Sequence, residues 1–147
     1  MRLFAFIFIF MVSFSAFAAD MPSVNLDGLM KEVKSHDGKT MVIFWAPWCP
    51  WCLKELKVIR DNPKFVSDNN LQIIGITKLN DKGKAENLVE HEKMPFRFII
   101  GEKDIYDKLQ RIDAVPLTIV YSNKGEQLDL EYGKQSIEDL NLMVEDY

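Results

Sequence analysis

The stretch FWAPWCPWCLKEL, residues 44–56, contains both cysteines of the chain, Cys49 and Cys52. An apolar run at residues 40–45, TMVIFW, leads into it and is typical of a buried strand. From Pro50 to residue 61 the apolar residues recur at helical spacing, and Pro63 is expected to end that helix. The stretch therefore predicts a strand, a turn and a helix, with Cys49 at the mouth of the helix and Cys52 in its first turn.

This placement favours the ionised form of Cys49. The start of a helix presents unpaired N–H groups and the positive end of the helix dipole, and both stabilise an anion. A C-x-x-C motif at such a position can lower a cysteine pKa from ~8.5 to ~3.5–7.5, and the thiolate is the nucleophile. Pro50 fits the first helical position, where its fixed φ and missing N–H cost nothing. We expect Cys49 to attack a disulfide and Cys52 to resolve the mixed disulfide.

Two other uses of the cysteine pair stay open on the residues alone. A structural zinc site usually needs four Cys or His ligands, and the chain adds only two scattered histidines, His36 and His91. A structural disulfide across so short a loop would remove little chain entropy. Both alternatives explain the motif less well than a redox pair does. No metal or organic cofactor is expected. Electrons are expected to come from another dithiol protein, because the sequence has no flavin or nicotinamide motif such as G-x-G-x-x-G.

The N-terminal residues predict export. Arg2 precedes an apolar run, and small residues follow at Ala16 and Ala18, which is typical of a signal peptide covering residues 1–18. The alternative is an uncleaved anchor, since the run reaches the lower limit of ~17 residues for a membrane span. We therefore expect a periplasmic protein, or one held in the inner membrane and facing the periplasm. Residues 19–147 then form one domain, in a compartment where cysteine pairs oxidise.

The charge balance argues against a nucleic-acid partner. The chain has a formal net charge of −4, and loss of Arg2 with the signal peptide would make it −5. Nucleic-acid-binding domains usually carry a basic face.

The remaining chain alternates between predicted strands and helices, which indicates an α/β fold with a central mixed sheet and helices on both faces. The helices are expected to form right-handed crossovers between parallel strands at the centre of the sheet. A closing hairpin with its turn at residues 123–125 adds an antiparallel edge. Ser136 is expected to cap the last helix. Strands are predicted at residues 40–45, 71–77, 96–100, 116–122 and 126–132, and helices at 26–35, 50–61, 84–93, about 105–112 and 136–144.

Two stretches resemble the thioredoxin superfamily. VIFWAPWCPWC, residues 42–52, is similar to its active-site strand and turn, and DAVPLTIVYSNKGEQ, residues 113–127, is similar to its second signature. The resemblance implies a thioredoxin fold and a cis peptide bond between Val115 and Pro116. It also implies that the backbone of Val115 lies beside Cys49 and pairs with an extended substrate segment, as in strand addition.

More narrowly, the chain resembles the exported TlpA-like branch, which contains reductases that serve cytochrome c maturation. Two features support this narrower resemblance. One is an extra helix–strand unit at about residues 84–100, and the other is an acid at Glu55, three residues after Cys52. The resemblance implies that Glu55 tunes the cysteines and moves protons; the alternative is a solvated charge between two lysines. Two features differ: Ile43 stands where thioredoxin buries an acid, and residues 26–35 look helical where many TlpA-like proteins have a β-hairpin.

These observations predict a thiol–disulfide oxidoreductase, most consistent with a reductase of protein disulfides that draws electrons from an upstream dithiol protein. The alternatives are a thiol oxidase or isomerase and a non-catalytic peptide-binding module. Trp51 is expected to pack on the partner. Trp48 is expected to pack against the sheet edge and shield the site, and Trp45 to lie in the core.

Overall fold

The computed structural model describes residues 20–109 and 112–145, so the predicted signal peptide at residues 1–18 lies outside the described residues. Strands and helices alternate along the chain, and most lie within a few residues of their predicted positions. The strands are β1 (Ser23–Val24), β2 (Lys39–Phe44), β3 (Leu71–Thr77), β4 (Arg97–Gly101), β5 (Leu117–Tyr121) and β6 (Gln127–Tyr132). The helices are α1 (Leu26–Ser35), α2 (Pro50–Asp61), α3 (Pro63–Asp68), the 3-10 helix η1 (Leu79–Asp81), α4 (Lys82–His91), α5 (Lys103–Lys108) and α6 (Ile137–Val144).

The strands of the described residues form one mixed sheet in the order β1-β4-β3-β2-β5-β6. The pairs β1–β4, β4–β3 and β3–β2 are parallel, whereas β5 is antiparallel to both β2 and β6. The predicted parallel centre and antiparallel edge are therefore confirmed. The extra helix–strand unit is also confirmed, as α4 and β4, and β4 lies between β3 and β1.

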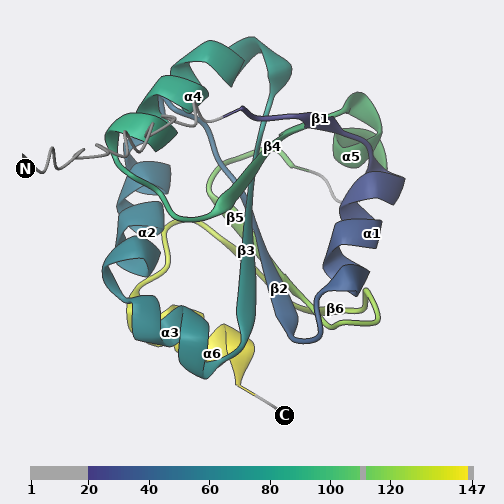
Figure 1. The fold of residues 1–147 in the computed structure, drawn as a ribbon, viewed down its shortest axis with the longest axis vertical. Coiled ribbons are helices and arrows are strands. Elements are labelled where there is room, and N and C mark those ends of the chain that lie inside the picture. The colour runs from purple at the N-terminus through teal and green to yellow at the C-terminus, as the bar shows by residue number, and fades with distance from the viewer. Residues whose placement is uncertain (1–19, 110–111, 146–147) are drawn as a thin grey trace, which may run out of the picture.

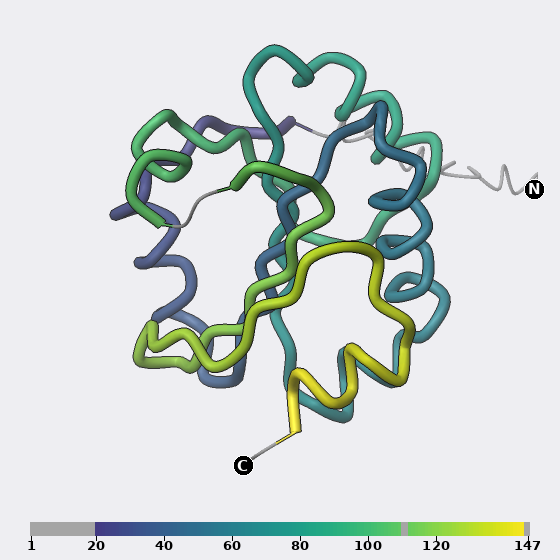
Figure 2. The backbone as a smooth tube through the Cα atoms, turned by 180° about the vertical axis from the view of Figure 1, so that it is seen from behind, coloured from purple at the N-terminus to yellow at the C-terminus, as the bar shows by residue number. Residues whose placement is uncertain are grey.

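Helices cover both faces of the sheet, as predicted (Figure 1). Helices α2, α3, α4 and α6 lie on one side, and α1 and α5 on the other. Side chains of β2 point alternately to the two sides, so that Met41 and Ile43 join one core and Val42 and Phe44 the other. Seen from behind, the chain leaves the β5–β6 hairpin and crosses to the α2 side, where α6 ends the fold (Figure 2).

Helix α2 is fixed to the sheet by its apolar face. Leu56 and Ile59 are fully buried in the same core as Cys52. Each such side chain stabilises the packed position by roughly 1.5–3 kcal/mol. The helix that starts at the cysteines is therefore held firmly against the strand that precedes them.

The prediction at Pro63 was only partly right. Helix α2 does end at Asp61, but Pro63 then begins a second helix, α3, that the sequence analysis did not predict. A proline suits the first position of a helix as well as it ends the previous one. Phe65 anchors α3 in the core. Strand β1 was also missed, because two residues carry no recognisable alternation.

Candidate active site

The active-site helix begins at the first cysteine. Cys49 is the N-cap of α2, with extended backbone angles, and Pro50 occupies the first turn. The backbone N–H of Cys52 donates to Sγ of Cys49 over 3.1 Å. The sulfur thus takes the place of the oxygen that usually caps a helix, where N–H groups stabilise an anion. The predicted position of Cys49 at the helix mouth is confirmed.

The two cysteines form a disulfide, with their Cα atoms 5.3 Å apart. Cys49 is 5% exposed and Cys52 is fully buried. Cys49 is thus the more exposed of the two sulfur-bearing residues, and the attacking and resolving roles stay predictions. Thiol–disulfide exchange needs this asymmetry, because the first attack creates a mixed disulfide that the inner thiol must break.

The segment before β5 lies against the disulfide. The peptide bond between Val115 and Pro116 is cis, as predicted. The carbonyl oxygen of Val115 lies 3.7 Å from Sγ of Cys49. Pro116 is buried, and its own carbonyl accepts a hydrogen bond from the N–H of Gly133 over 2.9 Å. The backbone of Val115 therefore lies beside the sulfur of Cys49, as the resemblance implies.

Glu55 is fully buried, so the solvated-charge alternative is wrong. Its Oε1 accepts from the hydroxyl of Thr118 over 2.5 Å, and its Oε2 accepts from the backbone N–H of Gln135 over 2.8 Å. Burial raises the pKa of Glu55 above its ordinary value, while these two hydrogen bonds and the charge of Lys134 partly oppose that effect. A buried carboxyl group with a raised pKa is typical of groups that transfer protons.

The position of the Glu55 carboxyl group can be compared with that of the buried acid in thioredoxin. Thr118 is the cross-strand partner of Ile43 in the β2–β5 pair. Ile43 stands where thioredoxin has its buried acid, so the carboxyl group reaches that region of the site from α2 instead of from the strand. On the helix, Glu55 is also the i+3 neighbour of Cys52, on the same side.

Thr118 and Gln135, the two donors to Glu55, were not predicted as site residues from the sequence. They lie 63 and 80 residues further along the chain. No local pattern connects them with α2, and a threonine in a strand is an ordinary residue.

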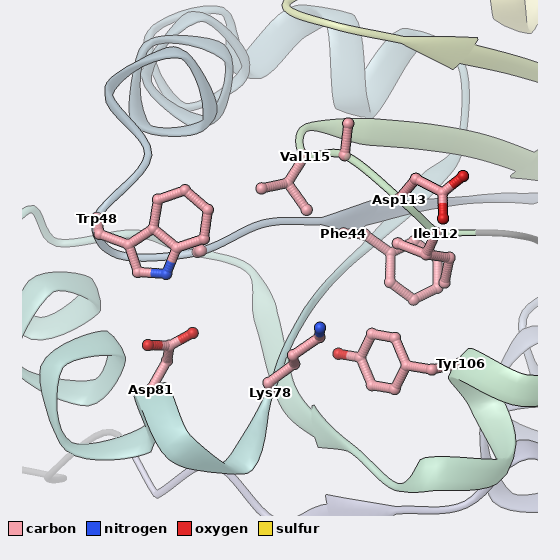
Figure 3. A pocket seen from close by; sticks show the side chains of 10 residues that line it. Phe44, Trp48, Lys78, Asp81, Tyr106, Ile112, Asp113 and Val115 are labelled. Atoms are coloured by element: carbon pink, nitrogen blue, oxygen red, sulfur yellow. The ribbon is translucent and has the colours of Figure 1, made fainter.

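The tryptophans next to the cysteines differ in their surroundings. Trp45 is buried as predicted, with its ring 5.5 Å from that of Phe98. The prediction that Trp48 packs closely against the sheet edge is wrong, because 66% of its surface is exposed. The turn before α2 carries its indole away from the core, and the ring forms one wall of a cavity (Figure 3). Trp51 is also 58% exposed, and the ammonium group of Lys54 lies 4.2 Å from its ring centre.

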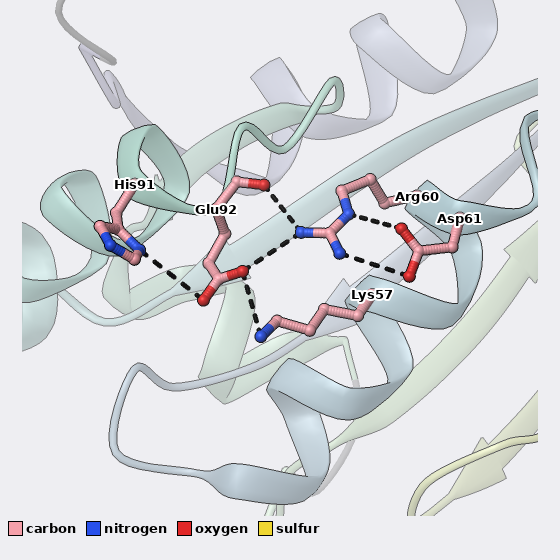
Figure 4. A network of polar contacts seen from close by, with 5 residues as sticks. All are labelled: Lys57, Arg60, Asp61, His91 and Glu92. Carbon is pink, nitrogen blue, oxygen red and sulfur yellow. Dashed lines mark hydrogen bonds and ion pairs between the residues drawn. The ribbon is translucent and has the colours of Figure 1, made fainter.

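A polar network ties the other end of α2 to the end of α4 (Figure 4). Arg60 donates to the backbone carbonyl of Glu92 over 2.8 Å and to its carboxylate over 3.2 Å, and Lys57 pairs with the same carboxylate at 3.1 Å. The hydrogen bond from Lys57 lowers the pKa of Glu92. The network links α2 to the α4–β4 unit, away from the cysteines.

The part of the chain that the structure describes comprises residues 20–109 and 112–145. None of their helices has the length and apolarity to cross a membrane. They also contain no group of three or more His, Cys, Asp or Glu side chains placed to hold a metal ion.

The model of the thioredoxin-like domain family matches residues 26–147. Among curated proteins, none matches the sequence significantly. The crystal structure of StoA from Bacillus subtilis is 23% identical, with a TM-score of 0.64 over 74% of this chain and 84% of that one.

Two other solved structures are similar. A secreted disulfide oxidoreductase of Mycobacterium tuberculosis, homologous to E. coli DsbE, is 20% identical, with a TM-score of 0.57 over 74% of this chain and 81% of that one. The thioredoxin domain of a thiol–disulfide oxidoreductase from Bacteroides vulgatus is 20% identical, with a TM-score of 0.60 over 74% and 78%. The family match, the shared fold and the disulfide at the start of α2 lead to one conclusion: the chain belongs to the thioredoxin-like domain family, and its Cys49–Cys52 pair is that of a thiol–disulfide oxidoreductase.

Proposed function

We propose that this thiol–disulfide oxidoreductase reduces disulfides in exported polypeptides, as a member of the TlpA-like branch. The observation that carries the proposal is the position of Cys49. Its sulfur receives the Cys52 N–H at 3.1 Å and lies 3.7 Å from the Val115 carbonyl. The nucleophile and the backbone that would hold the substrate are thus side by side.

The reaction has two exchange steps. The Cys49 thiolate attacks one sulfur of the substrate disulfide, which forms a mixed disulfide and releases the other substrate sulfur as a thiolate. The Cys52 thiol then loses its proton to Glu55 and attacks Sγ of Cys49. This closes the Cys49–Cys52 disulfide and releases the second substrate thiolate, so that two electrons pass to the substrate. A dithiol protein must afterwards return two electrons to Cys49–Cys52.

The buried acid supports the direction of reduction. Glu55 lies one turn from Cys52, fully buried. An ionised carboxylate there disfavours a thiolate nearby, which destabilises the reduced pair relative to the disulfide. A pair that prefers the disulfide is a reductant. The α4–β4 unit, which the TlpA-like resemblance implies, also supports this direction.

The reduction potential tests the direction. We expect the pair, equilibrated with glutathione or dithiothreitol, to have a potential near or below about −270 mV. A value near about −120 mV would identify an oxidant instead. The variant Glu55→Gln is the matched control, since it keeps the side-chain shape without the charge. Its potential is expected to be higher than that of the parent protein.

Trapping identifies the substrate. Cys52→Ala removes the resolving thiol, so mixed disulfides through Cys49 should accumulate, and reducing agent should release the partners. Complexes that survive reduction would favour the peptide-binding module. Cytochrome c precursors with a C-x-x-C-H motif are the specific partners to look for, because the TlpA-like branch includes reductases that act on them. Cys49→Ala is the control that captures nothing by disulfide.

Export is a separate part of the proposal. The pattern of residues 1–18 supports it, as do the secreted protein described above and a solved exposed lipoprotein thioredoxin from Streptococcus pneumoniae. Determining the N-terminal residue of the protein purified from cells separates the alternatives. A start at Ala19 indicates cleavage, and retention of residues 1–18 in the membrane fraction indicates an anchor.

A further inference from the structure

A small cavity opens directly beside the redox site (Figure 3). Its volume is about 110 Å³. Three of its lining residues also belong to the surroundings of Cys49. Trp48 precedes that cysteine, Ala46 accepts its backbone N–H over 3.1 Å, and the Val115 carbonyl lies 3.7 Å from its sulfur. The cavity and the disulfide therefore share one surface.

The walls of the cavity are mostly apolar. Phe44 at the end of β2, Ile112, Val115 and Trp48 supply carbon surface. The ring of Tyr106 closes another side and packs edge-on against Phe44, with ring centres 5.9 Å apart. Burial raises the pKa of the Tyr106 hydroxyl well above its ordinary range, so this wall stays uncharged at neutral pH.

Charged groups of both signs line the same cavity. Lys78 and Asp81, from the segment that follows β3, both contribute to it, and Asp113 lies near Val115. The ammonium group of Lys78 lies over the ring of Tyr106, 5.4 Å from its centre. The lining holds two carboxylates and one ammonium group, so its net negative charge disfavours an acidic guest. A charged guest would also lose its hydration on entering.

The size of the cavity limits its occupant. An engineered cavity of about 150 Å³ with apolar walls holds one benzene molecule. The cavity beside Cys49 is somewhat smaller, so it has room for one side chain and not for an organic cofactor.

We propose that this cavity binds an uncharged, apolar side chain of the substrate that stands two residues from the cysteine attacked by Cys49. The proposal rests on the proposed function. In an extended segment paired with Val115, residues i and i+2 point to the same face, roughly 6.6 Å apart. When the substrate cysteine faces Cys49, the side chain two positions away faces the neighbouring cavity. Leucine is the reference occupant.

Short peptide disulfides test the proposal. Each peptide has one central cysteine and is used as a disulfide-linked dimer, so that either sulfur carries the same sequence. Leucine, glycine, aspartate or lysine stands two residues before or two residues after the cysteine. The reduced protein converts each dimer into two peptide thiols and forms its own Cys49–Cys52 disulfide. The second-order rate constant is measured by chromatography of the released thiol.

On one side of the cysteine, leucine is expected to react roughly tenfold faster than glycine, aspartate or lysine, which is the usual discrimination of a small apolar pocket. On the other side of the peptide cysteine the residue should make little difference to the rate, because this cavity lies on one side of Cys49. Equal rates for all peptides, equal leucine effects on both sides, or a preference for a charged residue would overturn the proposal.

Variants separate the cavity from the rest of the site. Ala114 lines the cavity and is exposed, so Ala114→Phe should fill the space without disturbing the core. The ratio of leucine to glycine rates should fall towards one. Tyr106→Ala enlarges the cavity and should shift the preference from leucine to phenylalanine. Leu142→Ala, which removes an exposed apolar side chain on α6, is the matched control and should leave the ratio unchanged.

Glutathione disulfide distinguishes the two proposals. It tests the cysteine pair without a side chain for the cavity. If the protein reduces glutathione disulfide and all peptides at similar rates, the proposed function stands and the cavity proposal fails. If it reduces none of them, both fail. If Ala114→Phe leaves the leucine preference intact, a different surface reads the peptide and the cavity proposal fails.

Discussion

Replacing Thr118 by valine tests whether the buried Glu55 carboxyl group ionises in the folded protein. The Thr118 hydroxyl donates to Oε1 of Glu55 over 2.5 Å, and both side chains are fully buried. Valine has nearly the same shape as threonine and suits a strand equally well. Thr118→Val therefore removes one donor to the carboxyl group with little other change.

The cost of this change should depend on pH. A hydrogen bond between neutral groups contributes about 0.5–1.5 kcal/mol, and one to a charged group about 1.5–3 kcal/mol. Loss of the donor raises the pKa of Glu55 further above its unfolded value. Stability linked to a raised pKa is present below the unfolded pKa and is lost as pH rises through the folded pKa. The free energy of unfolding should therefore fall by about 1 kcal/mol at acidic pH and by about 2 kcal/mol once Glu55 is ionised.

Denaturant unfolding of the disulfide form between pH 4 and 9 measures both values, and the oxidised state keeps thiol ionisation out of the comparison. The same substitution in a Glu55→Gln background is the control. Glutamine has no charge, so the cost of Thr118→Val should there be independent of pH. A cost that is constant across this pH range in the parent protein, or that varies equally in both backgrounds, would refute the reasoning.

Three more predictions concern the site and the fold. In the reduced protein, the first thiol to ionise should do so below the pKa of about 8.5 of free cysteine, because Cys49 caps α2; ultraviolet thiolate absorbance measures this, and an ordinary value would contradict it. Glu55→Gln should be least stable relative to the parent protein at acidic pH and gain as pH rises through the raised folded pKa, as thermal unfolding at several pH values can follow. Gly75→Ala should destabilise the fold by about 1–3 kcal/mol, since its Cβ would lie 2.5 Å from the Phe98 ring. Gly83→Ala, in α4 with nothing within 4 Å, should instead stabilise it by up to about 1 kcal/mol, and denaturant unfolding compares the pair.

Much of the redox site could be predicted from local sequence. The apolar run, the spacing of the cysteines and Pro50 place a strand end and a helix start next to each other, and these are short-range properties of the chain. Cys49 therefore lies at the N-cap of α2 as expected. The resemblance at residues 113–127 added the cis bond before Pro116 and its position beside the sulfur, which the structure confirms.

The environment of those residues could be known only from the tertiary structure. Sequence alone left Glu55 between a solvated charge and an acid that tunes the cysteines, because a helix position fixes the direction of a side chain and not what surrounds it. Thr118 and Gln135 decide the matter from 63 and 80 residues away. Trp48 was misplaced for the same reason. Whether a side chain is buried depends on which distant segments pack over it, and no pattern within a few residues contains that information.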